Sequence, residues 1–414
     1  MGQGRLTNKD RSGEWPAELK KVAAASKLSA DAEAPILIEM HKPDAKKRFT
    51  ELLSKQHITI VNDNYDEQFA ELIVSRHPQL YRSSYEVKRE SLKDYIERHG
   101  NGQPGWQLGT WVYYPWSGAL VHVLERELFF ESKTIRNKDL LTNDQQKRYA
   151  DFAVGCAGMS VGSNVALALG LTMGSTQLKI ADGAVVSASN LNRIVAGVDA
   201  VGVSKSLIVA RRLYEMNPYA AVRRYGELDE EGLKNFFEQD WPLRAVVDEI
   251  DDLEMKVRLR VEARRRGLPV IMATDLGDDV MLDIERFDLN PNLPLFHGLV
   301  KDAESLLTRT VGKQEWMKYA MQIIGVKNVP LALQKSLLKV GTHLVTQPQL
   351  GGTALMSGVA AAYAVRQIAL GTPLKSGRVI VSFDQKLRKD AGTLAHWREL
   401  RAHTKELERA LGSM

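Results

Sequence analysis

The 414-residue sequence predicts an α/β protein with a doubly wound, mostly parallel sheet and a smaller α/β domain before it. Between residues 151 and 274, short apolar runs alternate with helical patterns, which is typical of parallel strands joined by crossover helices. The first run, "DFAVG", leads into a glycine-rich turn and then a helix. Residues 1–130 carry a separate set of short strands and helices, so we expect an N-terminal α/β extension of unknown role.

The elements expected in residues 1–130 follow from apolar periodicity and from turn residues. A polar, Ala/Lys-rich lead with a short helix occupies residues 1–34. The remaining pattern predicts two short strands, three helices and one hairpin, in the segments "APILIEM", "DAKKRFTELLSKQ", "HITIVND", "YDEQFAELIVSRHP", "SYEVKRESLKDYIERHG" and "TWVYYPWSGALVHVLE".

Residues 131–385 are expected to form the main domain, and residues 386–414 a charged C-terminal helix. Beyond an Ala-rich helix and the strand "RVIVSF", the pattern after residue 300 predicts little. The alternating elements of the main domain are "DFAVG", "SNVALALGLTMG", "QLKIAD", "VSKSLIVARRLYEMN", "AAVRRYGEL", "DEEGLKNFFEQ", "AVVDEI", "EMKVRLRVEARRRG" and "LPVIMAT".

The turn after "DFAVG" predicts a nucleotide site of the Rossmann-like kind. Gly155, Gly158 and Gly162 would let the backbone approach a phosphate, and the following helix would offer its first amides. Asp182 ends the next strand, about twenty residues later, where such folds place the carboxylate that accepts ribose hydroxyls. The spacing is not a strict GxGxxG, and glycines also serve close packing of helix on strand.

The stretch "SNLNR", residues 189–193, offers amide donors and a fixed positive charge just past a strand, which suggests an anionic ligand. The series "ADGAVVSASNLNR", "GVSK", "NP" and "VVDEIDD" resembles the ThiF/MoeB family of ATP-dependent adenylyltransferases, whose fold underlies the ubiquitin-activating enzymes. The resemblance runs from about residue 136 to residue 371. It implies a ThiF-type sheet and an enzyme that binds ATP and Mg²⁺.

Carried over by position, the resemblance implies that Asp182 holds the ATP ribose and that Asn190, Arg193 and Lys205 hold the phosphates. Arginine can grip a phosphate with two parallel hydrogen bonds, whereas lysine acts as a point charge. Both would offset the negative charge that develops as pyrophosphate leaves. The alternative is structural: Asn190 and Arg193 would cap a helix and pair with nearby acids, and Lys205 would be a solvated helix lysine.

Two further roles come only from the resemblance. Asp251 would bind Mg²⁺, with the cap of the following helix as the rival role. Arg136 would reach into the active site of a neighbouring subunit, which implies a homodimer.

The sequence also departs from the family pattern. Ala184 replaces the usual second aspartate, Met159 and Ser160 stand where glycines are common, and Asp252 replaces an asparagine. These changes concern nucleotide affinity rather than the fold.

The chain has a single cysteine, Cys156, so it has no internal disulfide and no zinc site built on CxxC pairs. The family segment that often carries a catalytic cysteine has none. We interpret Cys156 as a packing residue, because a reactive thiol needs a base and access. An acyl-adenylate would then pass directly to an amine, water or an internal group, without a cysteine thioester.

Composition predicts an ordinary globular protein. A net charge of +5 is small beside 56 basic and 51 acidic side chains, so it does not suggest a nucleic-acid partner. The polar start has no signal-peptide pattern. The longest small-apolar stretch is interrupted by Arg366 and Gln367, so it predicts a buried helix rather than a membrane span. We expect a cytoplasmic protein.

Three functions remain open on the sequence. The leading one is ATP- and Mg²⁺-dependent adenylation of a carboxylate that belongs to a peptide, a carrier protein or a small metabolite. The second is a non-catalytic ThiF-fold scaffold that binds a nucleotide. The third is an NAD- or FAD-dependent oxidoreductase, although hydride transfer does not require residues that bind a triphosphate.

Overall fold

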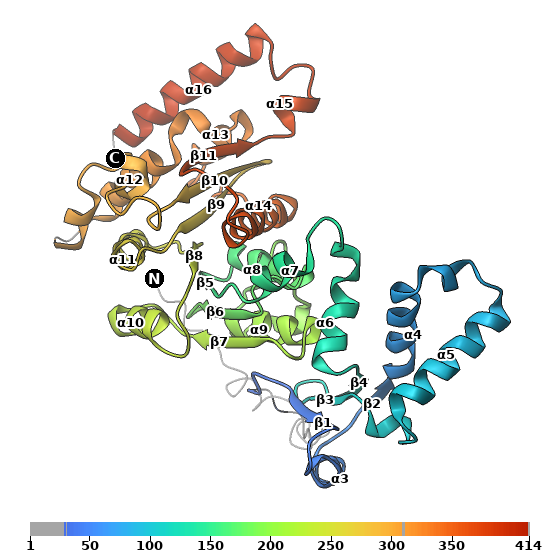
Figure 1. The fold of residues 1–414 in the computed structure, drawn as a ribbon. Helices are drawn as coiled ribbons and strands as arrows, with labels where there is room; N and C mark the ends of the chain where they lie inside the picture. Colours follow the sequence, from blue (N-terminus) through green and yellow to red (C-terminus); the bar gives the residue numbers. More distant parts are fainter. Residues whose placement is uncertain (1–28, 30, 309–310, 413–414) are drawn as a thin grey trace, which may run out of the picture. The chain divides into compact units, whose positions relative to one another are not determined.

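The computed structural model describes residues 29, 31–308 and 311–412 and divides into two units, Met1–Ser132 and Lys133–Met414 (Figure 1). The helical lead predicted for residues 1–34 lies almost entirely outside the described residues.

Among its described residues, the first unit has a four-stranded sheet in the order β1-β3-β4-β2, with helices α3, α4 and α5. Strand β3 pairs antiparallel with β1 and β4, and β2 pairs parallel with β4. The predicted strands, helices and hairpin of this unit are confirmed. Their bounds are β1 Ile36–Glu39, α3 Ala45–Lys55, β2 Ile60–Asp63, α4 Tyr65–Arg76, α5 Tyr85–Gly100, β3 Thr110–Tyr114 and β4 Ala119–Val123, with short 3₁₀ turns at Pro78–Arg82 and Gly105–Gln107.

A buried histidine organises the centre of this unit. The ring of His122 stacks between Trp111, with 4.3 Å between centroids, and Tyr65, at 5.0 Å. Its two nitrogens lie 2.8 Å from a carboxylate oxygen of Asp63 and 2.8 Å from the carbonyl oxygen of Leu108. The aromatic residues of the hairpin therefore form core.

The second unit contains a seven-stranded sheet in the order β11-β10-β9-β8-β5-β6-β7. Strands β5 to β9 are parallel, whereas β10 and β11 run antiparallel to their neighbours. Strand order reverses between β5 and β8, and open α/β sheets bind ligands beyond the carboxyl ends of such strands. The bounds are β5 Val154–Ala157, β6 Gln177–Ala181, β7 Ala221–Tyr225, β8 Ala245–Asp248, β9 Val270–Leu276, β10 Asp279–Glu285 and β11 Gly377–Val381.

Helices cover both faces of this sheet, so the predicted doubly wound architecture is confirmed. Helices α8, α9 and α14 lie on one face, and α10 and α11 lie on the other (Figure 1). The helices associated with this unit are α6 Arg126–Thr134 (which spans the boundary), α7 Asn143–Ala150, α8 Val161–Leu171, α9 Lys205–Met216, α10 Glu230–Glu238, α11 Leu253–Arg265, α12 Lys313–Ile324, α13 Leu331–Leu337, α14 Gly351–Ala369, α15 Asp384–Leu387 and α16 Leu394–Gly412, with 3₁₀ turns at Ile135–Asn137, Ala188–Asn190, Val198–Ala200, Leu295–Gly298, Ala303–Thr308 and Val326–Asn328.

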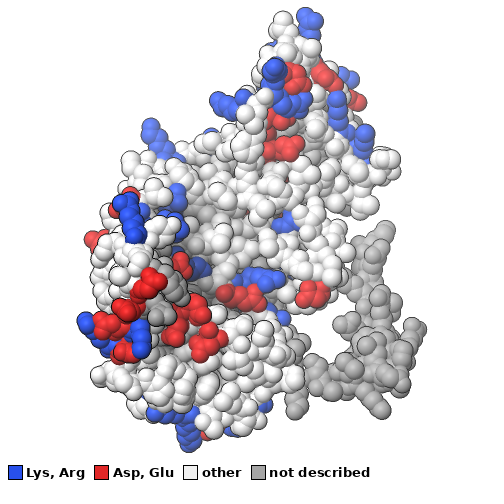
Figure 2. Space-filling model, turned by 90° about the vertical axis from the view of Figure 1, so that its right-hand side faces the viewer, with Lys and Arg blue, Asp and Glu red and all other residues white. Residues whose placement is uncertain are grey.

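The charged helix at the C-terminal end packs on α13. Thr404 of α16 and Gln334 of α13 are hydrogen-bonded to each other, and Lys335 pairs with Glu399 at 2.6 Å. Leu407 joins the apolar cluster beneath them. Figure 2 shows charges of both signs mixed along the upper part of the molecule, where α15 and α16 lie.

Within the described part of the chain, we find no helix that is both long enough and apolar enough to cross a membrane.

Candidate functional site

The glycine turn after β5 is tied to the end of β6. Gly158 has a φ of +88°, and its N–H donates to the carbonyl of Ala181 at 2.8 Å. The next amide, of Met159, donates to one carboxylate oxygen of Asp182 at 2.7 Å, and the amide of Ala184 donates to the other at 2.7 Å. Asp182 therefore lies at the turn, as predicted, but two turn amides already have protein acceptors.

Lys205 reaches the same carboxylate. It is the first residue of α9, and its Nζ lies 3.8 Å from a carboxylate oxygen of Asp182, with both side chains mostly buried. Its backbone N–H donates to the carbonyl of Ala184 at 3.0 Å. Ala184 contributes through its backbone alone, so the loss of the family's aspartate leaves this connection intact.

The "SNLNR" loop follows β6 in the chain and contacts the start of α8. The side-chain oxygen of Asn190 accepts from the N–H of Ser187 at 3.0 Å and closes a 3₁₀ turn, which is the structural role that the sequence left open. Arg193 instead extends across the loop. Its Nε donates to the hydroxyl of Ser160 at 3.0 Å, and another guanidinium nitrogen donates to the carbonyl of Ser189 at 3.2 Å.

Helix α14 begins against this loop. A Cβ at Gly351 would lie 2.0 Å from the carbonyl oxygen of Asn192, so only glycine fits there. The side-chain amide of Asn192 donates to the carbonyl of Gln349 at 2.8 Å, and that of Asn164 in α8 donates to the carbonyl of Arg193 at 3.0 Å. Helices α8 and α14 thus hold the loop that carries Arg193.

Packing explains two of the three predicted cofactor-binding glycines. Gly155 lies inside β5, and a Cβ there would meet the ring of Phe236 at 2.5 Å. Gly162 lies in α8, where a Cβ would meet the side chains of Met159 at 3.3 Å and Glu249 at 3.4 Å. Gly158 alone combines a positive φ with a position in the turn.

Two acidic residues at the same sheet edge were not predicted. Glu249 follows β8, and its carboxylate accepts the N–H of Ala273 in β9 at 2.9 Å. Burial raises the pKa of Glu249 well above its usual value, and the charges of Asp248 and Asp275 add to the rise while Lys256 opposes it.

Asp275, near the end of β9, is the second acidic residue. It accepts a hydrogen bond from the hydroxyl of Ser357 in α14. Burial raises its pKa, against the opposing effects of Ser357 and the charge of Arg193. The sequence signal for both acids was present, since each ends an apolar strand, but the resemblance assigned them no role.

Behind the edge, Asp248 is fully buried. Burial opposes its ionised form, yet Lys256 at 3.1 Å and the contacting guanidinium of Arg260 hold its pKa below the usual value. Arg260 also donates to Glu285 at 2.6 Å. Asp248, Lys256, Arg260 and Glu285 thus form ion pairs with one another in the core.

Asp251, the predicted magnesium ligand, is exposed in the loop after β8. The cap of α11 belongs to its neighbour Asp252, whose carboxylate accepts the N–H of Met255 at 2.8 Å. Asp252, and not Asp251, therefore caps α11. Among the described residues, no cluster of three or more His, Cys, Asp or Glu side chains is arranged to hold a metal.

Arg136 and Cys156 stand apart from this group. Arg136 is exposed in the turn Ile135–Asn137, and no contact among the described residues joins it to the Asp182 cluster. Cys156 is fully buried in β5, and burial together with the charge of Glu249 raises its pKa to about 12. The thiol is thus protonated and inaccessible at neutral pH.

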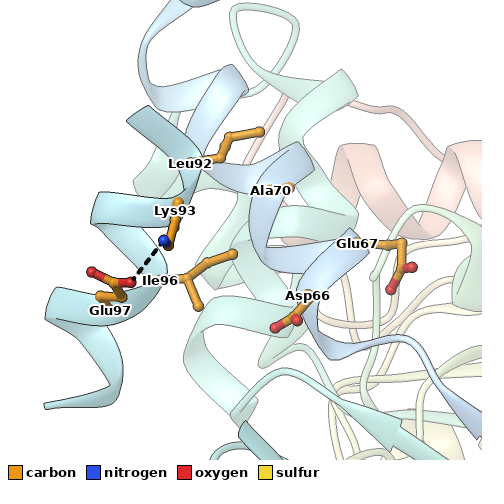
Figure 3. Close-up of a pocket in the computed structure, with 7 residues that line it drawn as sticks. All are labelled: Asp66, Glu67, Ala70, Leu92, Lys93, Ile96 and Glu97. Atoms are coloured by element: carbon orange, nitrogen blue, oxygen red, sulfur yellow. Dashed lines mark ion pairs between the residues drawn. The ribbon is translucent and has the colours of Figure 1, made fainter. Parts of the chain in front are cut away.

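A groove lies elsewhere, between α4 and α5 of the first unit, with a volume of about 590 Å³ (Figure 3). Its floor is apolar, its rim is mostly acidic, and Lys93 pairs with Glu97 across one turn of α5 at 3.8 Å. None of the predicted site residues lines it. The lining residues are Asp66, Glu67, Ala70, Leu92, Lys93, Ile96 and Glu97.

Comparison with solved structures finds similar folds at low identity. PaaA, in a selenomethionine crystal structure, is 18% identical, with a TM-score of 0.42 over 62% of this chain and 77% of that chain. The E. coli tRNA N6-threonylcarbamoyladenosine dehydratase TcdA is 18% identical, with a TM-score of 0.41 over 58% of this chain and 95% of that chain. E. coli MccB, solved with ATP, is 15% identical, with a TM-score of 0.42 over 62% and 67%.

Sequence comparison identifies a closer relative, the uncharacterized protein MT1398 of Mycobacterium tuberculosis (strain CDC 1551 / Oshkosh). It is 34% identical over 278 residues, which is 67% of this chain but only 38% of the relative's length. The ThiF family model matches residues 132–342, which is 211 of 414 residues, or about half of the chain. This match confirms the resemblance read from "SNLNR" and its flanking motifs: the chain belongs to the ThiF family.

Proposed function

We propose that this protein uses ATP to adenylate a carboxylate and then passes the acyl group directly to a nucleophile. The observation that carries the proposal is the convergence of Asp182, Lys205 and Arg193 at the turn between β5 and α8. This turn lies at the reversal of strand order, where such sheets bind nucleotides. Family membership supports the same reaction class.

The first step has a distinct role for each side chain. Asp182 is held by two backbone amides and would accept the ribose hydroxyls of ATP. Lys205 and Arg193 would hold the phosphates and stabilise the charge on departing pyrophosphate. Among the described residues, Arg193 is bonded to the hydroxyl of Ser160 and to neutral oxygens of Ser189 and Asn192. A phosphate could replace these partners and form charge-assisted hydrogen bonds.

The positive charge of a bound Mg²⁺ would offset the negative charge of the phosphates. Asp251 fits this ion, because it is an exposed carboxylate in the loop at the carboxyl end of β8, and carboxylate oxygens are the ligands that Mg²⁺ prefers. A site with one or two carboxylates plus substrate phosphates is the usual magnesium arrangement.

The second step would need no thioester. The buried, protonated Cys156 does not have the properties of a nucleophile. The acyl group would pass from AMP to an acceptor at the open sheet edge, and a homodimer completed by Arg136 remains part of the proposal. The carboxylate would belong to a peptide, a carrier protein or a small metabolite. The test must identify which of these is the substrate.

ATP–pyrophosphate exchange measured against a panel of carboxylates tests the reaction. Arg193→Ala should slow exchange by about a hundredfold, the usual cost of removing one charge-stabilising group from a transition state. Cys156→Ser should retain most of the exchange and transfer, and Arg223→Ala, which removes a surface ion pair with Asp240, is the matched arginine control.

The opposite pattern would reject the mechanism. If Cys156→Ser abolished transfer but spared exchange, an acyl-cysteine step would be required. Calorimetry with ATP–Mg²⁺ and with NAD separates the remaining functions: tight NAD binding without ATP binding would favour an oxidoreductase, and ATP binding with no exchange would favour a scaffold.

A further inference from the structure

The groove between α4 and α5 of the first unit, named here the α4–α5 groove, contains none of the residues of the proposed nucleotide site. Its volume of about 590 Å³ falls within the range of roughly 300–1,000 Å³ that is usual for binding pockets. Leu92 and Ile96 extend from α5 toward α4 (Figure 3), and together with Ala70 of α4 they form the apolar floor. All three are only half-buried, so the helix pair leaves apolar surface uncovered.

The charged residues that line the α4–α5 groove are mostly acidic. Asp66, Glu67 and Glu97 contribute three carboxylates, and Lys93 contributes one ammonium group. Lys93 is already paired with Glu97 along α5, with 3.8 Å between its Nζ and a carboxylate oxygen. Asp66 and Glu67 are exposed and form no ion pair with any residue that the structure describes. Both carboxylates are therefore open to a positively charged partner.

The shape and the charge of the groove together select one kind of ligand. Two neighbouring helices offer a groove into which a third helix can place apolar side chains that lie three or four residues apart. Lysine or arginine side chains on the flanks of that helix would meet the carboxylates of Asp66 and Glu67. Nucleic acids and anionic membranes present phosphates instead, which these carboxylates would repel.

We propose that the α4–α5 groove binds a basic amphipathic helix of a partner protein. The apolar side chains of this helix face the floor of the groove, and its lysine or arginine side chains face the carboxylates. This binding function goes beyond the proposed adenylation and does not depend on it. The chain as a whole carries a net charge of +5, so the overall charge of the protein does not attract a basic partner, whereas the groove does.

A designed peptide is the probe for this site. It has about 18 residues, enough to form a helix, with leucine along one face and lysine along the other. One control peptide has glutamate in place of lysine, and a second has the composition of the probe in scrambled order. Fluorescence anisotropy with the full-length protein should show that the probe binds about tenfold more tightly than either control, and added salt should weaken its binding.

Two matched variants of α5 locate the binding. Glu97→Lys removes a carboxylate that lines the groove. Asp94→Lys removes an exposed carboxylate that does not line it and that pairs with Arg98 at 2.7 Å along the same helix. Glu97→Lys should weaken binding of the probe by about tenfold, whereas Asp94→Lys should leave the affinity nearly unchanged.

Ile96→Ala tests the apolar floor. The Ile96 side chain is half-buried, so the variant should remain folded, and its thermal unfolding is compared with that of the parent to verify this. Loss of apolar contact with the probe should weaken binding by about tenfold. Leu53→Ala, which shortens a side chain that is 47% exposed on α3, is the control and should bind the probe as the parent does.

Several results would overturn the proposal. Equal binding of the probe and the scrambled peptide, or equal losses in Glu97→Lys and Asp94→Lys, would show a non-specific attraction. Absence of probe binding to the parent would reject the site.

Two further results would assign the α4–α5 groove to another occupant. Loss of self-association in Glu97→Lys, measured by sedimentation without any probe, would assign it to a second copy of this chain. Preferential binding of a peptide with the sequence of residues 17–28, which carries three lysines and one glutamate, would assign it to the chain's own lead. None of these measurements uses ATP or an acyl substrate, so their outcome and that of the adenylation test are independent.

Discussion

At the scale of single residues, the glycine turn serves the protein's own packing. Gly158 has a φ of +88°, and a Cβ there would lie 2.3 Å from the carbonyl oxygen of Glu249. The loop after β8 therefore crosses directly against the turn after β5. A glycine motif in a sequence reports close approach of backbone, but it does not report whether the approaching group is a phosphate or another loop.

Gly158→Ala should destabilise the protein through both conformation and contact. Gly202→Ala is a matched control, because Gly202 has a φ of +89° with no atom within 4 Å. A left-handed alanine costs on the order of 1–2 kcal/mol, so the control should lose about this free energy of unfolding and Gly158→Ala should lose more. Urea denaturation measures both, and equal losses would show that the contact with Glu249 relaxes freely.

Glu249 should also make stability depend on pH. Its pKa is raised above 4.5 in the folded protein, so the folded state holds the proton more tightly than the unfolded state. The resulting stabilisation is present below the unfolded pKa and is lost as pH rises through the folded pKa.

The side chain introduced by Glu249→Gln cannot ionise. The free energy of unfolding of this variant should therefore increase relative to that of the parent as pH rises from about 4.5 upward. Parallel urea titrations at mildly acidic and mildly alkaline pH measure the difference. A difference that stays constant with pH would indicate that the carboxyl group ionises normally in the folded protein.

At the scale of elements, parallel strands and crossover helices were predictable because their apolar runs are buried on both faces. The first strand was placed slightly early: β5 spans Val154–Ala157, so it continues into the glycine turn. Strand β10 was not predicted, because its buried acids resemble surface residues in sequence. Their partners are remote in the chain, with Arg378 paired to Asp283 at 2.7 Å.

The same reasoning explains how much of the site the sequence could predict. The family motif identified Asp182, Arg193 and Lys205, and the structure brings them to one turn. Glu249 and Asp275 were missed because an acid at the end of a strand has no distinct meaning until its neighbours are known.

Lys179, in strand β6, bonds to the C-terminal end of helix α10 in the same unit. It lies fully buried in β6, burial lowers its pKa, and its ammonium donates to the carbonyls of Phe236, at 2.9 Å, and Gln239. These carbonyls end α10 and have no further turn of helix to bond them. The lysine therefore acts as the C-terminal cap of α10.

Lys179→Met should destabilise the protein by about 1–3 kcal/mol, because it leaves buried carbonyls without donors. Hydrogen exchange should accelerate first at the end of α10. Lys234→Met, on the exposed face of the same helix, is the control and should change little. If both variants unfold at the parent's denaturant concentration, the buried bonds of Lys179 contribute no net stability.

At the scale of the whole molecule, the remaining prediction is a homodimer with composite sites. Arg136 is exposed, and it is not joined to the Asp182 cluster by contacts within the described chain. The family resemblance assigns this arginine to the neighbouring subunit's site. A symmetric dimer would supply it twice, once to each site.

Complementation between two inactive variants tests this arrangement directly. In a mixed dimer of Arg136→Ala and Arg193→Ala chains, one site keeps Arg193 from its own chain and receives Arg136 from the other, while the second site lacks both. Random exchange places half of the chains in mixed dimers, so equal mixing should restore about a quarter of parent exchange activity. Sedimentation should show twice the 46.3 kDa chain mass. A monomer, or a mixture no more active than its components, would mean that Arg136 acts within its own chain or not at all.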